Sequence, residues 1–266
     1  MPLLQIVVLS IVQGITEFLP VSSSGHLIAT AKFFGRDQGL VIDVAVHVGT
    51  LGAVLSYFWR DLYAMGSGMV HLALGRVSDG ARLALYVLAG TVPVFVFGFL
   101  FRDLVGTAFR SVELVAWTTI GFGIVLYLAD RFGMTLNRIE HLRLSHVLFI
   151  GLAQVLALIP GTSRSGITMT AGRIMGYERR DAARFSMLLS IPAIAGAGAL
   201  LGAEVYAAGD WELGRDALLA AALSFLAALG AIASLMRWLR SAGFTPFVIY
   251  RLGFGALLLV FARSLG

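Results

Sequence analysis

Long apolar segments separated by short polar stretches dominate this chain. An α-helix needs about 20 mostly apolar residues to cross a hydrocarbon core of about 30 Å. Six stretches have that length and end in loops rich in Arg, Asp or Gly: residues 42–59, 82–101, 112–130, 185–203, 217–236 and 247–263. The pattern therefore predicts an all-α polytopic membrane protein with six full transmembrane helices.

Two further apolar regions, residues 3–34 and 146–175, are interrupted by proline and small polar residues. The first break has the sequence PVSSSGH (20–26), and the second break has the sequence PGTSRSG (160–166). Each half of such a region is too short to cross a membrane alone, and non-helical backbone at that depth must be buried in protein or line a wet cavity. We therefore expect two re-entrant hairpins, each a broken helix pair that enters and leaves by one face.

The two broken regions resemble each other. Gln13 lies seven residues before Pro20, Gln154 lies six before Pro160, and both breaks run from proline through small residues to Ser-Gly. We interpret this likeness as an internal repeat of about 140 residues. Three crossings between the hairpins would invert the second half. In such folds the N-terminal ends of broken helices meet near the midplane and point at anions.

Composition supports this picture. The chain has 266 residues, 58% hydrophobic and 13% charged, with a mean hydropathy of +0.87. We expect one integral membrane domain over residues 1–266, with inverted halves of about 1–135 and 136–266. The start lacks the basic region and cleavage site of a signal peptide, so we expect it to belong to the mature fold. Cysteine is absent, which excludes disulfides, thiolate metal sites and a Cys nucleophile.

Basic residues give a topology signal. The predicted loops on one side carry twelve Lys and Arg residues, whereas the side with both termini carries six. The positive-inside rule makes the richer side cytoplasmic, so we expect both termini outside and the first hairpin open to the outer face. No basic run with interleaved aromatics indicates nucleic-acid binding. The oligomeric state is not fixed by the sequence, which is compatible with a homodimer.

An acidic residue lies next to the first break. Glu17 follows Gln13 by four residues, so both project from one helix face just before Pro20. Ionisable groups at membrane depth are costly and usually face a cavity or a partner, which makes Glu17 a candidate site residue. The alternative is that Glu17 only caps backbone N–H groups that the break exposes.

Three serines and a histidine follow Glu17. Ser22, Ser23 and Ser24 lie where a second short helix should begin, and capping that helix explains only one of them. His26 lies within a turn of Ser23, so a hydroxyl and an imidazole can approach as nucleophile and base. The alternative is a buried histidine that is merely hydrogen-bonded. Beside Glu17, the constellation favours a catalytic role for His26.

The second break contains an arginine in an apolar hairpin. Arg164 needs an anionic partner there, and its five donors match phosphate oxygens. Thr162, Ser163 and Ser165 add hydroxyls and N–H groups at a helix start, which together make a nest for phosphate. The alternative is a structural ion pair between Arg164 and Glu17 across the repeat interface. Arg164 can serve in both ways if it pairs with Glu17 only when no phosphate is bound.

Three other charged or titratable residues lie within predicted spans. Asp43 and His47 are four residues apart on one helix face and are candidates for supporting or proton-transfer groups around the site. Asp43 lies at the start of its span, where a side chain can also reach water. Arg251 lies near the start of the last span and is open to the same interpretation.

The two breaks carry a family resemblance. QGITEFLPVSSSGH (13–26) and PGTSRSG (160–166), in this order, resemble the bacterial undecaprenyl-diphosphate phosphatase family, also known as the bacitracin-resistance proteins. The resemblance covers the whole chain, including DVAVHVGTLGAV (43–54), TVP (91–93) and FVIYR (247–251).

The resemblance implies a hydrolase of the bacterial cytoplasmic (inner) membrane that acts on a phosphoric anhydride. It implies removal of the terminal phosphate of undecaprenyl diphosphate, which recycles the lipid carrier for peptidoglycan synthesis and confers bacitracin resistance. The implied partners are a polyprenyl diphosphate substrate and membrane lipids. The implied cofactor is a divalent metal, Mg²⁺ or Ca²⁺.

The family motifs also imply residue roles. The first motif places the catalytic acid at Glu17 and the family's serine and histidine at Ser23 and His26. The second motif places phosphate contacts at Ser163, Arg164 and Thr168. With the residues that adjoin them, the expected phosphate-binding set is Ser22, Ser24, Thr162, Ser163, Arg164, Ser165 and Thr168.

The expected metal ligands are Gln13 and Glu17. Many family members have Glu where this chain has Gln13, so one of two carboxylates that could share a metal is missing. A glutamine can still offer its carbonyl oxygen to Mg²⁺ or Ca²⁺.

These expectations combine into a mechanism. The diphosphate would dock between the breaks, Arg164 would stabilise the developing charge, Ser23 would attack, and His26 would shuttle the proton. Glu17, with Gln13, would orient His26 or hold the metal. Attack by water, or by His26 itself, fits the sequence nearly as well.

A function from another class is also open. Inverted repeats with broken helices are the ordinary architecture of secondary carriers, so a lipid-phosphate flippase or anion carrier could use Arg164 without cleaving a bond. Hydrolysis is favoured because Ser23, His26 and Glu17 supply more nucleophile and base than a binding site needs.

Overall fold

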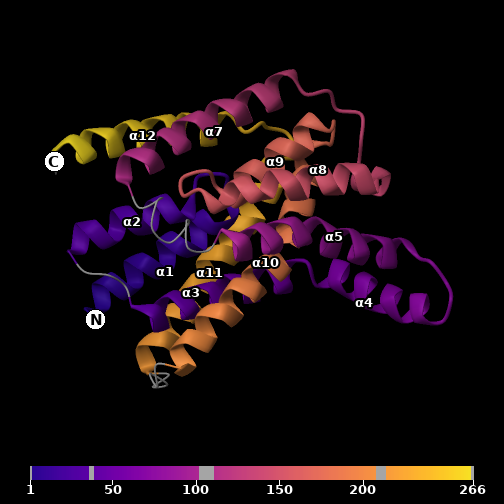
Figure 1. Cartoon of the computed structure of the whole chain (residues 1–266), viewed down its shortest axis with the longest axis horizontal. Coiled ribbons are helices and arrows are strands. Elements are labelled where there is room, and N and C mark those ends of the chain that lie inside the picture. Colours follow the sequence, from indigo (N-terminus) through magenta and orange to yellow (C-terminus); the bar gives the residue numbers. More distant parts are fainter. Residues whose placement is uncertain (1, 36–38, 102–110, 208–213, 265–266) are drawn as a thin grey trace.

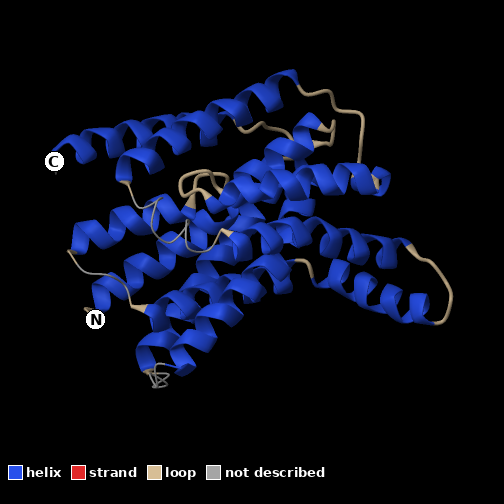
Figure 2. Cartoon of the chain, viewed as in Figure 1, coloured by secondary structure: helices blue, strands red, loops and turns tan. Residues whose placement is uncertain are grey.

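The computed structural model describes residues 2–35, 39–101, 111–207 and 214–264, and over these ranges it is all-helical, without a sheet (Figures 1 and 2). Its helices are α1 (Leu3–Phe18), α2 (Ser23–Phe34), α3 (Leu40–Tyr57), α4 (Trp59–Ala73), α5 (Asp79–Leu100), α7 (Val112–Phe132), α8 (Leu144–Val155), α9 (Arg164–Ile174), α10 (Arg179–Ala207), α11 (Arg215–Trp238) and α12 (Thr245–Ser264). Short 3₁₀ turns cover Ile139–His141 and Leu156–Leu158.

Six of the described helices are long and apolar enough to cross a membrane, namely α3, α5, α7, α10, α11 and α12. They coincide with the six predicted spans, so that prediction is confirmed. The largest difference is at α10, which begins at Arg179 rather than at 185. The apolar run marks only the membrane part. The first turn of α10 is polar because Arg179 contacts Asp130 and Asp181 accepts from the backbone N–H of Ile139.

The interpretation of residues 60–82 as a loop is wrong over α4, which is a helix that packs against α5. Glycines allow this close contact. A Cβ at Gly68 would lie 2.3 Å from the Ala81 nitrogen, and a Cβ at Gly80 would lie 2.0 Å from the Ala64 carbonyl oxygen. The segment has too few apolar residues to be detected as a span, and its small residues resemble a loop in the sequence.

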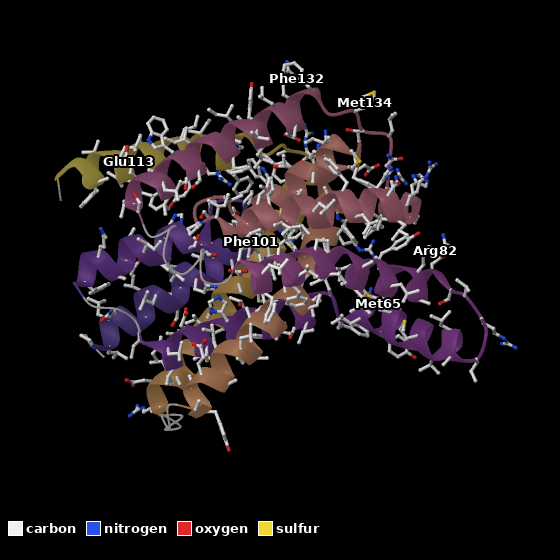
Figure 3. All side chains as sticks on the ribbon, in the orientation of Figure 1. Met65, Arg82, Phe101, Glu113, Phe132 and Met134 are labelled. Carbon is white, nitrogen blue, oxygen red and sulfur yellow. The ribbon has the colours of Figure 1, made fainter. Side chains whose placement is uncertain are left out.

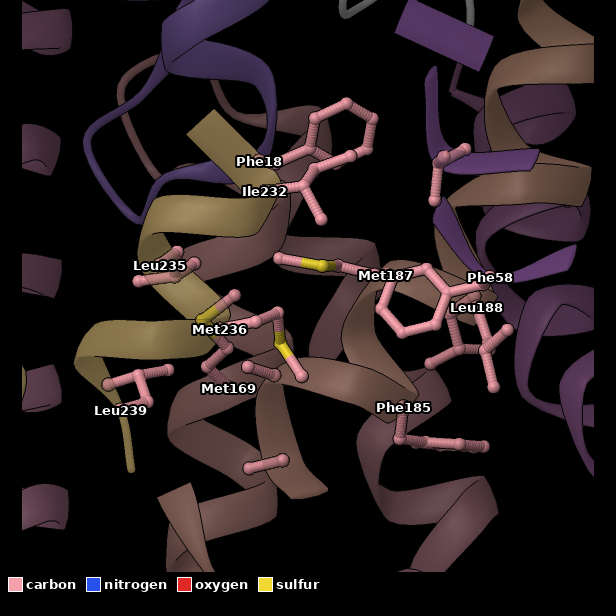
Figure 4. Packing of buried hydrophobic residues seen from close by; sticks show 14 of the residues in the cluster. Phe18, Phe58, Met169, Phe185, Met187, Leu188, Ile232, Leu235, Met236 and Leu239 are labelled. Atoms are coloured by element: carbon pink, nitrogen blue, oxygen red, sulfur yellow. The ribbon is translucent and has the colours of Figure 1, made fainter. Parts of the chain in front are cut away.

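Each of the two broken regions forms the expected pair of short helices. α1 packs against α2 across the first break, and α8 packs against α9 across the second break. Their inner ends reach the main core. Figure 4 shows Phe18 of α1, Met169 of α9, Met187 of α10 and Ile232 of α11 in one cluster, and all four side chains are fully buried. In Figure 1 the start of α1 and the end of α12 lie at one end of the molecule, opposite the turn between α4 and α5.

A buried carboxylate ties several helix ends together. Asp130, at the end of α7, accepts from Arg173 Nε at 3.1 Å, from Arg179 Nε at 2.7 Å and from the Phe244 N–H at 3.1 Å. Arg173 is also buried and donates to the carbonyl of Gly133. The sequence analysis counted these arginines only as a topology signal. Asp130 therefore connects the C-terminal ends of α7 and α9 to the N-terminal ends of α10 and α12.

We expect Asp130→Ala to lower the free energy of unfolding by about 3 kcal/mol, because the substitution leaves the buried Arg173 charge without its partner. The measurement is denaturant unfolding of the purified protein in detergent. Asp79→Ala is the matched control, since the Asp79 side chain is 99% exposed in its pair with Arg82. Equal losses of stability in the two variants would show that the Asp130 contacts contribute nothing beyond a surface pair.

Candidate active site

Both breaks have the same local geometry. Ser22 and Ser163 have φ angles of 76° and 71°, and they are the only non-glycine residues with positive φ in the described ranges. Each caps the helix that follows: Ser22 Oγ accepts from Gly25 N at 3.4 Å, and Ser163 Oγ accepts from Gly166 N at 3.1 Å. Backbone held in this region is strained and concentrates at functional sites. The expected serine caps are thus present.

The Glu17 carboxylate accepts hydrogen bonds from residues of both breaks. Its Oε1 accepts from Arg164 Nη2 at 3.1 Å. Its Oε2 accepts from Gln13 Nε2 at 3.0 Å and from Ser23 Oγ at 3.0 Å. The Glu17–Arg164 ion pair, which was the alternative to phosphate binding by Arg164, is therefore present, and the predicted shared face of Gln13 and Glu17 is confirmed. The side chains of Glu17 and Arg164 are 9% and 15% exposed, so the pair lies largely out of solvent.

Arg164 is held on its other side by α10. Its Nη1 donates to the Ser186 carbonyl at 3.3 Å, and the Ser186 hydroxyl lies 2.6 Å from Thr168 Oγ1. Thr168 also donates to the Arg164 carbonyl at 2.9 Å. Thr168 thus links the Arg164 backbone to Ser186, the residue whose carbonyl binds the Arg164 side chain. Ser186 could not be predicted as a site residue, because it is a lone small polar residue within an apolar span.

Two serines link the breaks directly. Ser24 Oγ accepts from Gly161 N at 3.3 Å, and Ser165 Oγ donates to the Leu19 carbonyl at 2.9 Å. In this state Ser24 and Ser165 therefore fix the position of one break against the other. The Thr162 hydroxyl is fully buried and has no hydrogen-bond partner among the described residues. Of the expected phosphate-binding groups, the Arg164 guanidinium is the one that contacts the Glu17 carboxylate.

Arg251 of α12 connects the backbones of the two breaks. It is fully buried and donates to Pro20 O at 3.3 Å, Gly161 O at 3.1 Å, Thr162 O at 3.0 Å and Thr119 O at 2.9 Å. None of the salt bridges found in the described ranges involves it. The Arg251 side chain does not extend to the surface. Its positive charge lies between the breaks, and its hydrogen-bond partners among the described residues are backbone carbonyl oxygens. The breaks consequently carry a net attraction for anions.

His26 is bound by a residue that the sequence analysis did not identify. Its Nδ1 lies 2.7 Å from the Ser22 carbonyl oxygen, and its Nε2 lies 2.6 Å from the Tyr250 hydroxyl. The ring stacks on Phe254 with centroids 4.0 Å apart. Because a carbonyl only accepts, Nδ1 carries the proton of the neutral ring, and Nε2 accepts from Tyr250.

The expected hydrogen bond between Ser23 and His26 is absent from the described contacts. The Ser23 hydroxyl points instead to Glu17, and the His26 ring nitrogens are taken by Ser22 and Tyr250. The reason is that Ser22 caps α2, which brings its carbonyl oxygen within reach of the His26 ring on the same turn. The basic group that contacts the Ser23 hydroxyl is thus Glu17 and not His26.

We expect Tyr250→Phe to lower kcat by about tenfold, the equivalent of one lost hydrogen bond, because Nε2 of His26 loses the group that fixes its orientation. The measurement is the turnover rate as a function of pH, since a purely structural loss would not change the shape of the profile. Tyr63→Phe is the control, because Tyr63 is 73% exposed on α4. An unchanged kcat and profile in Tyr250→Phe would remove Tyr250 from the site.

Asp43 and His47 form a pair on α3. His47 Nδ1 lies 2.7 Å from the Asp43 carbonyl oxygen and 3.6 Å from Asp43 Oδ1. The groups that contact Glu17 come from α1, α2 and α9. The described polar contacts of the His47 ring are with Asp43, so they give no support for a role of His47 beside Glu17.

The residues around Glu17 suit one kind of metal site. No group of three His, Cys, Asp or Glu side chains that could hold a metal occurs within the described part of the chain. Glu17 is the carboxylate of the site, and the neighbouring Gln13 Oε1 is buried without a hydrogen-bond partner among the described residues. Mg²⁺ is commonly held by one or two carboxylates together with substrate phosphates. Glu17 and Gln13 therefore fit an ion that the substrate itself largely coordinates.

Comparison with known proteins shows which proteins this chain resembles. The profile of the family described as "Bacitracin resistance protein BacA" matches residues 6–257. A protein of Roseobacter denitrificans named "Undecaprenyl-diphosphatase" is 50% identical, with 99% of this chain and 100% of the relative covered. Proteins of the same name from Jannaschia sp. and Alteromonas mediterranea are 52% and 46% identical, and the match covers 99% and 98% of this chain and 100% and 99% of the relatives.

Proposed function

This chain belongs to the bacitracin resistance protein BacA family and is an undecaprenyl-diphosphatase, and we propose that its two breaks together form the active site. One observation carries the proposal. The Glu17 carboxylate binds the Ser23 hydroxyl of the first break and the Arg164 guanidinium of the second break at the same time. A nucleophile, a base and an anion-binding group thus lie within one hydrogen-bond shell.

The protein is a multi-pass membrane protein with six candidate spans, and we propose that its halves are inverted repeats. Ser22 and Ser163, and likewise Gly35 and Gly176, are 141 positions apart and all have positive φ. α1 packs against α11, and α8 packs in the same way against α5. Three spans, α3, α5 and α7, separate the two hairpins, which supports two re-entrant hairpins of opposite direction.

The proposed orientation places both termini outside the bacterial cytoplasmic (inner) membrane, with the site open to the outer face. The excess of Lys and Arg on the opposite side supports it. Of the six basic residues counted on the outer side, Arg36, Arg102 and Arg110 lie outside the described residues, as does the side chain of Arg263. An outward site suits a lipid carrier that is released where cell-wall units are attached.

Binding follows from charge. In the proposed complex the diphosphate replaces Glu17 as the partner of Arg164, whose planar fork matches two phosphate oxygens. The N-terminal ends of α2 and α9 add partial positive charge, and Arg251 adds a full one between the breaks. These groups also stabilise the charge that develops on the transferred phosphoryl group.

Bond cleavage is proposed to occur in two steps. Glu17 accepts the Ser23 proton as Ser23 Oγ bonds to the terminal phosphorus. The bond from that phosphorus to the bridging oxygen breaks, and its electron pair leaves with undecaprenyl phosphate. Water then attacks the phosphoserine, and the basic Nε2 of His26 accepts the water proton. The bond from phosphorus to Ser23 Oγ breaks, Ser23 takes back the proton held by Glu17, and inorganic phosphate leaves with the proton from His26. Direct attack of water on the diphosphate would use the same groups.

A divalent metal is proposed to be held by Glu17 and the Gln13 carbonyl oxygen together with the diphosphate. When bound, it would supply Lewis-acid stabilisation of the phosphate oxygens. The chain's own residues keep their roles: Arg164 binds the phosphates, and Ser23 and Glu17 exchange the proton.

Trapping a phosphorylated enzyme tests this assignment. Purified protein in detergent is mixed with undecaprenyl diphosphate labelled at the terminal phosphate, quenched early in turnover, and the labelled peptide is mapped. We expect the label on Ser23 and none in Ser23→Ala. Label absent from both Ser23 and His26 in the wild type, with phosphate still released, would favour direct attack by water.

A further inference from the structure

An apolar groove runs along the outside of α1 and α11. It has a volume of about 700 Å³ and is walled by Ile11 and Ile15 of α1, by Leu19 just after α1, by α11 between residues 223 and 238, and by Phe247 of α12. Ile11 and Ile15 are 39% and 40% exposed, so the groove is open along its side. A chain could therefore move into it from the surrounding lipid without threading.

The groove adjoins the proposed active site at Leu19. Leu19, which lines it, is two residues from Glu17, and the Leu19 carbonyl accepts the Ser165 hydroxyl of the second break at 2.9 Å. The next residue, Pro20, binds Arg251. The Leu19 carbonyl therefore contacts the proposed phosphate site, whereas the Leu19 side chain lines the groove.

We propose that this groove binds the isoprenoid chain of the substrate, which rests on the proposed placement of the diphosphate between the breaks. A chain attached to that diphosphate would leave the site beside Leu19, whose side chain lines the groove. Residues 223 to 238 of α11 extend over about 22 Å at the helical rise, a length that holds several isoprene units. The walls are apolar apart from Ser234, which suits a hydrocarbon ligand.

A second apolar groove makes a natural comparison. It lies between α3, α10 and α11, has a volume of about 360 Å³, and includes Val48, Gly202 and Tyr206 among its walls. None of its walls belongs to a break or to the residues next to one. Any apolar groove on a membrane protein can hold a lipid chain, but of these two grooves in the described part of the chain the α1–α11 groove is the one that adjoins the proposed phosphate site.

Filling each groove separately tests the proposal. Gly230 and Gly202 each lie in one groove with nothing within 4 Å of an added Cβ, so a larger side chain at either position begins in open space. We expect Gly230→Phe to raise KM for undecaprenyl diphosphate about fivefold with kcat unchanged. The effect is moderate because the chain exchanges lipid contacts for groove contacts and loses only packing. Gly202→Phe should leave both constants unchanged.

Photocrosslinking of the wild-type protein gives a second measurement that needs no variant. The probe is a polyprenyl diphosphate with a benzophenone on its chain, and we expect crosslinks in α1 and α11 around Gly230 that excess undecaprenyl diphosphate suppresses. Crosslinks in α3 and α10 around Gly202, or an equal rise of KM in both variants, would overturn the groove assignment. Arg164→Ala separates the two claims: if it retains activity, the phosphate site itself is misplaced, whatever the crosslinks show.

Discussion

Replacing Arg164 by alanine should lower kcat/KM for undecaprenyl diphosphate by about 10³-fold, which is typical for removing a cation that stabilises a transferred phosphoryl group. The arginine has its Nη2 on Glu17 and its Nη1 on the Ser186 carbonyl, so its fork is already oriented at the site. Its loss also leaves the buried Glu17 charge without a cationic partner, and this negative charge repels an incoming diphosphate. Both KM and kcat should therefore worsen.

Phosphate release from undecaprenyl diphosphate by the purified variant in detergent measures this loss. Arg180→Ala is the control, because Arg180 is an exposed arginine at the start of α10. The melting temperature of each variant shows whether the fold survives. A folded Arg164→Ala enzyme with the wild-type rate would mean that the diphosphate binds elsewhere.

Replacing Glu17 by glutamine should lower kcat by about 10³-fold, within the range that general-base catalysis supplies. The amide keeps the volume of the side chain and can still accept the Ser23 hydroxyl, but it cannot take up the proton. Turnover should fall even at saturating substrate, whereas loss of a purely binding residue would appear mainly in KM.

The control for Glu17→Gln is Glu113→Gln. Glu113 is exposed in the first turn of α7, on the outside of the molecule in Figure 3. Turnover by Glu113→Gln should equal that of the wild type. If Glu17→Gln keeps the wild-type kcat while Ser23→Ala is inactive, the base that activates Ser23 is another group.

The arrangement of spans and breaks could be predicted from the sequence because each rests on a local signal. Apolar runs of membrane length predicted the six spans, and proline followed by small polar residues predicted both breaks. The Glu17–Arg164 pair was also predictable, since two opposite charges at membrane depth have few other partners. These features need no knowledge of how distant segments meet.

The remaining features depend on distant contacts. Tyr250 is 224 positions from His26, and Arg251 reaches Pro20 and the second break from the last helix. Asp130 likewise collects partners from three later segments. In the sequence these residues look like ordinary members or ends of spans. The contacts of Tyr250 and Arg251 form only when α12 packs against α7 and the breaks, and those of Asp130 form only when the later segments pack against the end of α7.

The partner of Ser23 illustrates the same limit at short range. Ser23 and His26 lie within one turn, which favoured a direct bond between them, yet spacing alone does not fix which way each side chain points. Ser22 adopts a positive φ to cap α2, and this turns its carbonyl toward the His26 ring. The Ser23 hydroxyl then meets Glu17 from the other side of the break.

A double-mutant cycle on Glu17→Gln and Arg164→Ala tests most directly whether the two breaks form one site. Groups that act as a unit lose little more when both are removed, whereas independent groups of this size would multiply to a loss of about 10⁶-fold. We predict that kcat/KM of the double variant stays near that of the slower single variant. A loss equal to the product of the two single losses would show that the breaks act separately and would contradict the shared site.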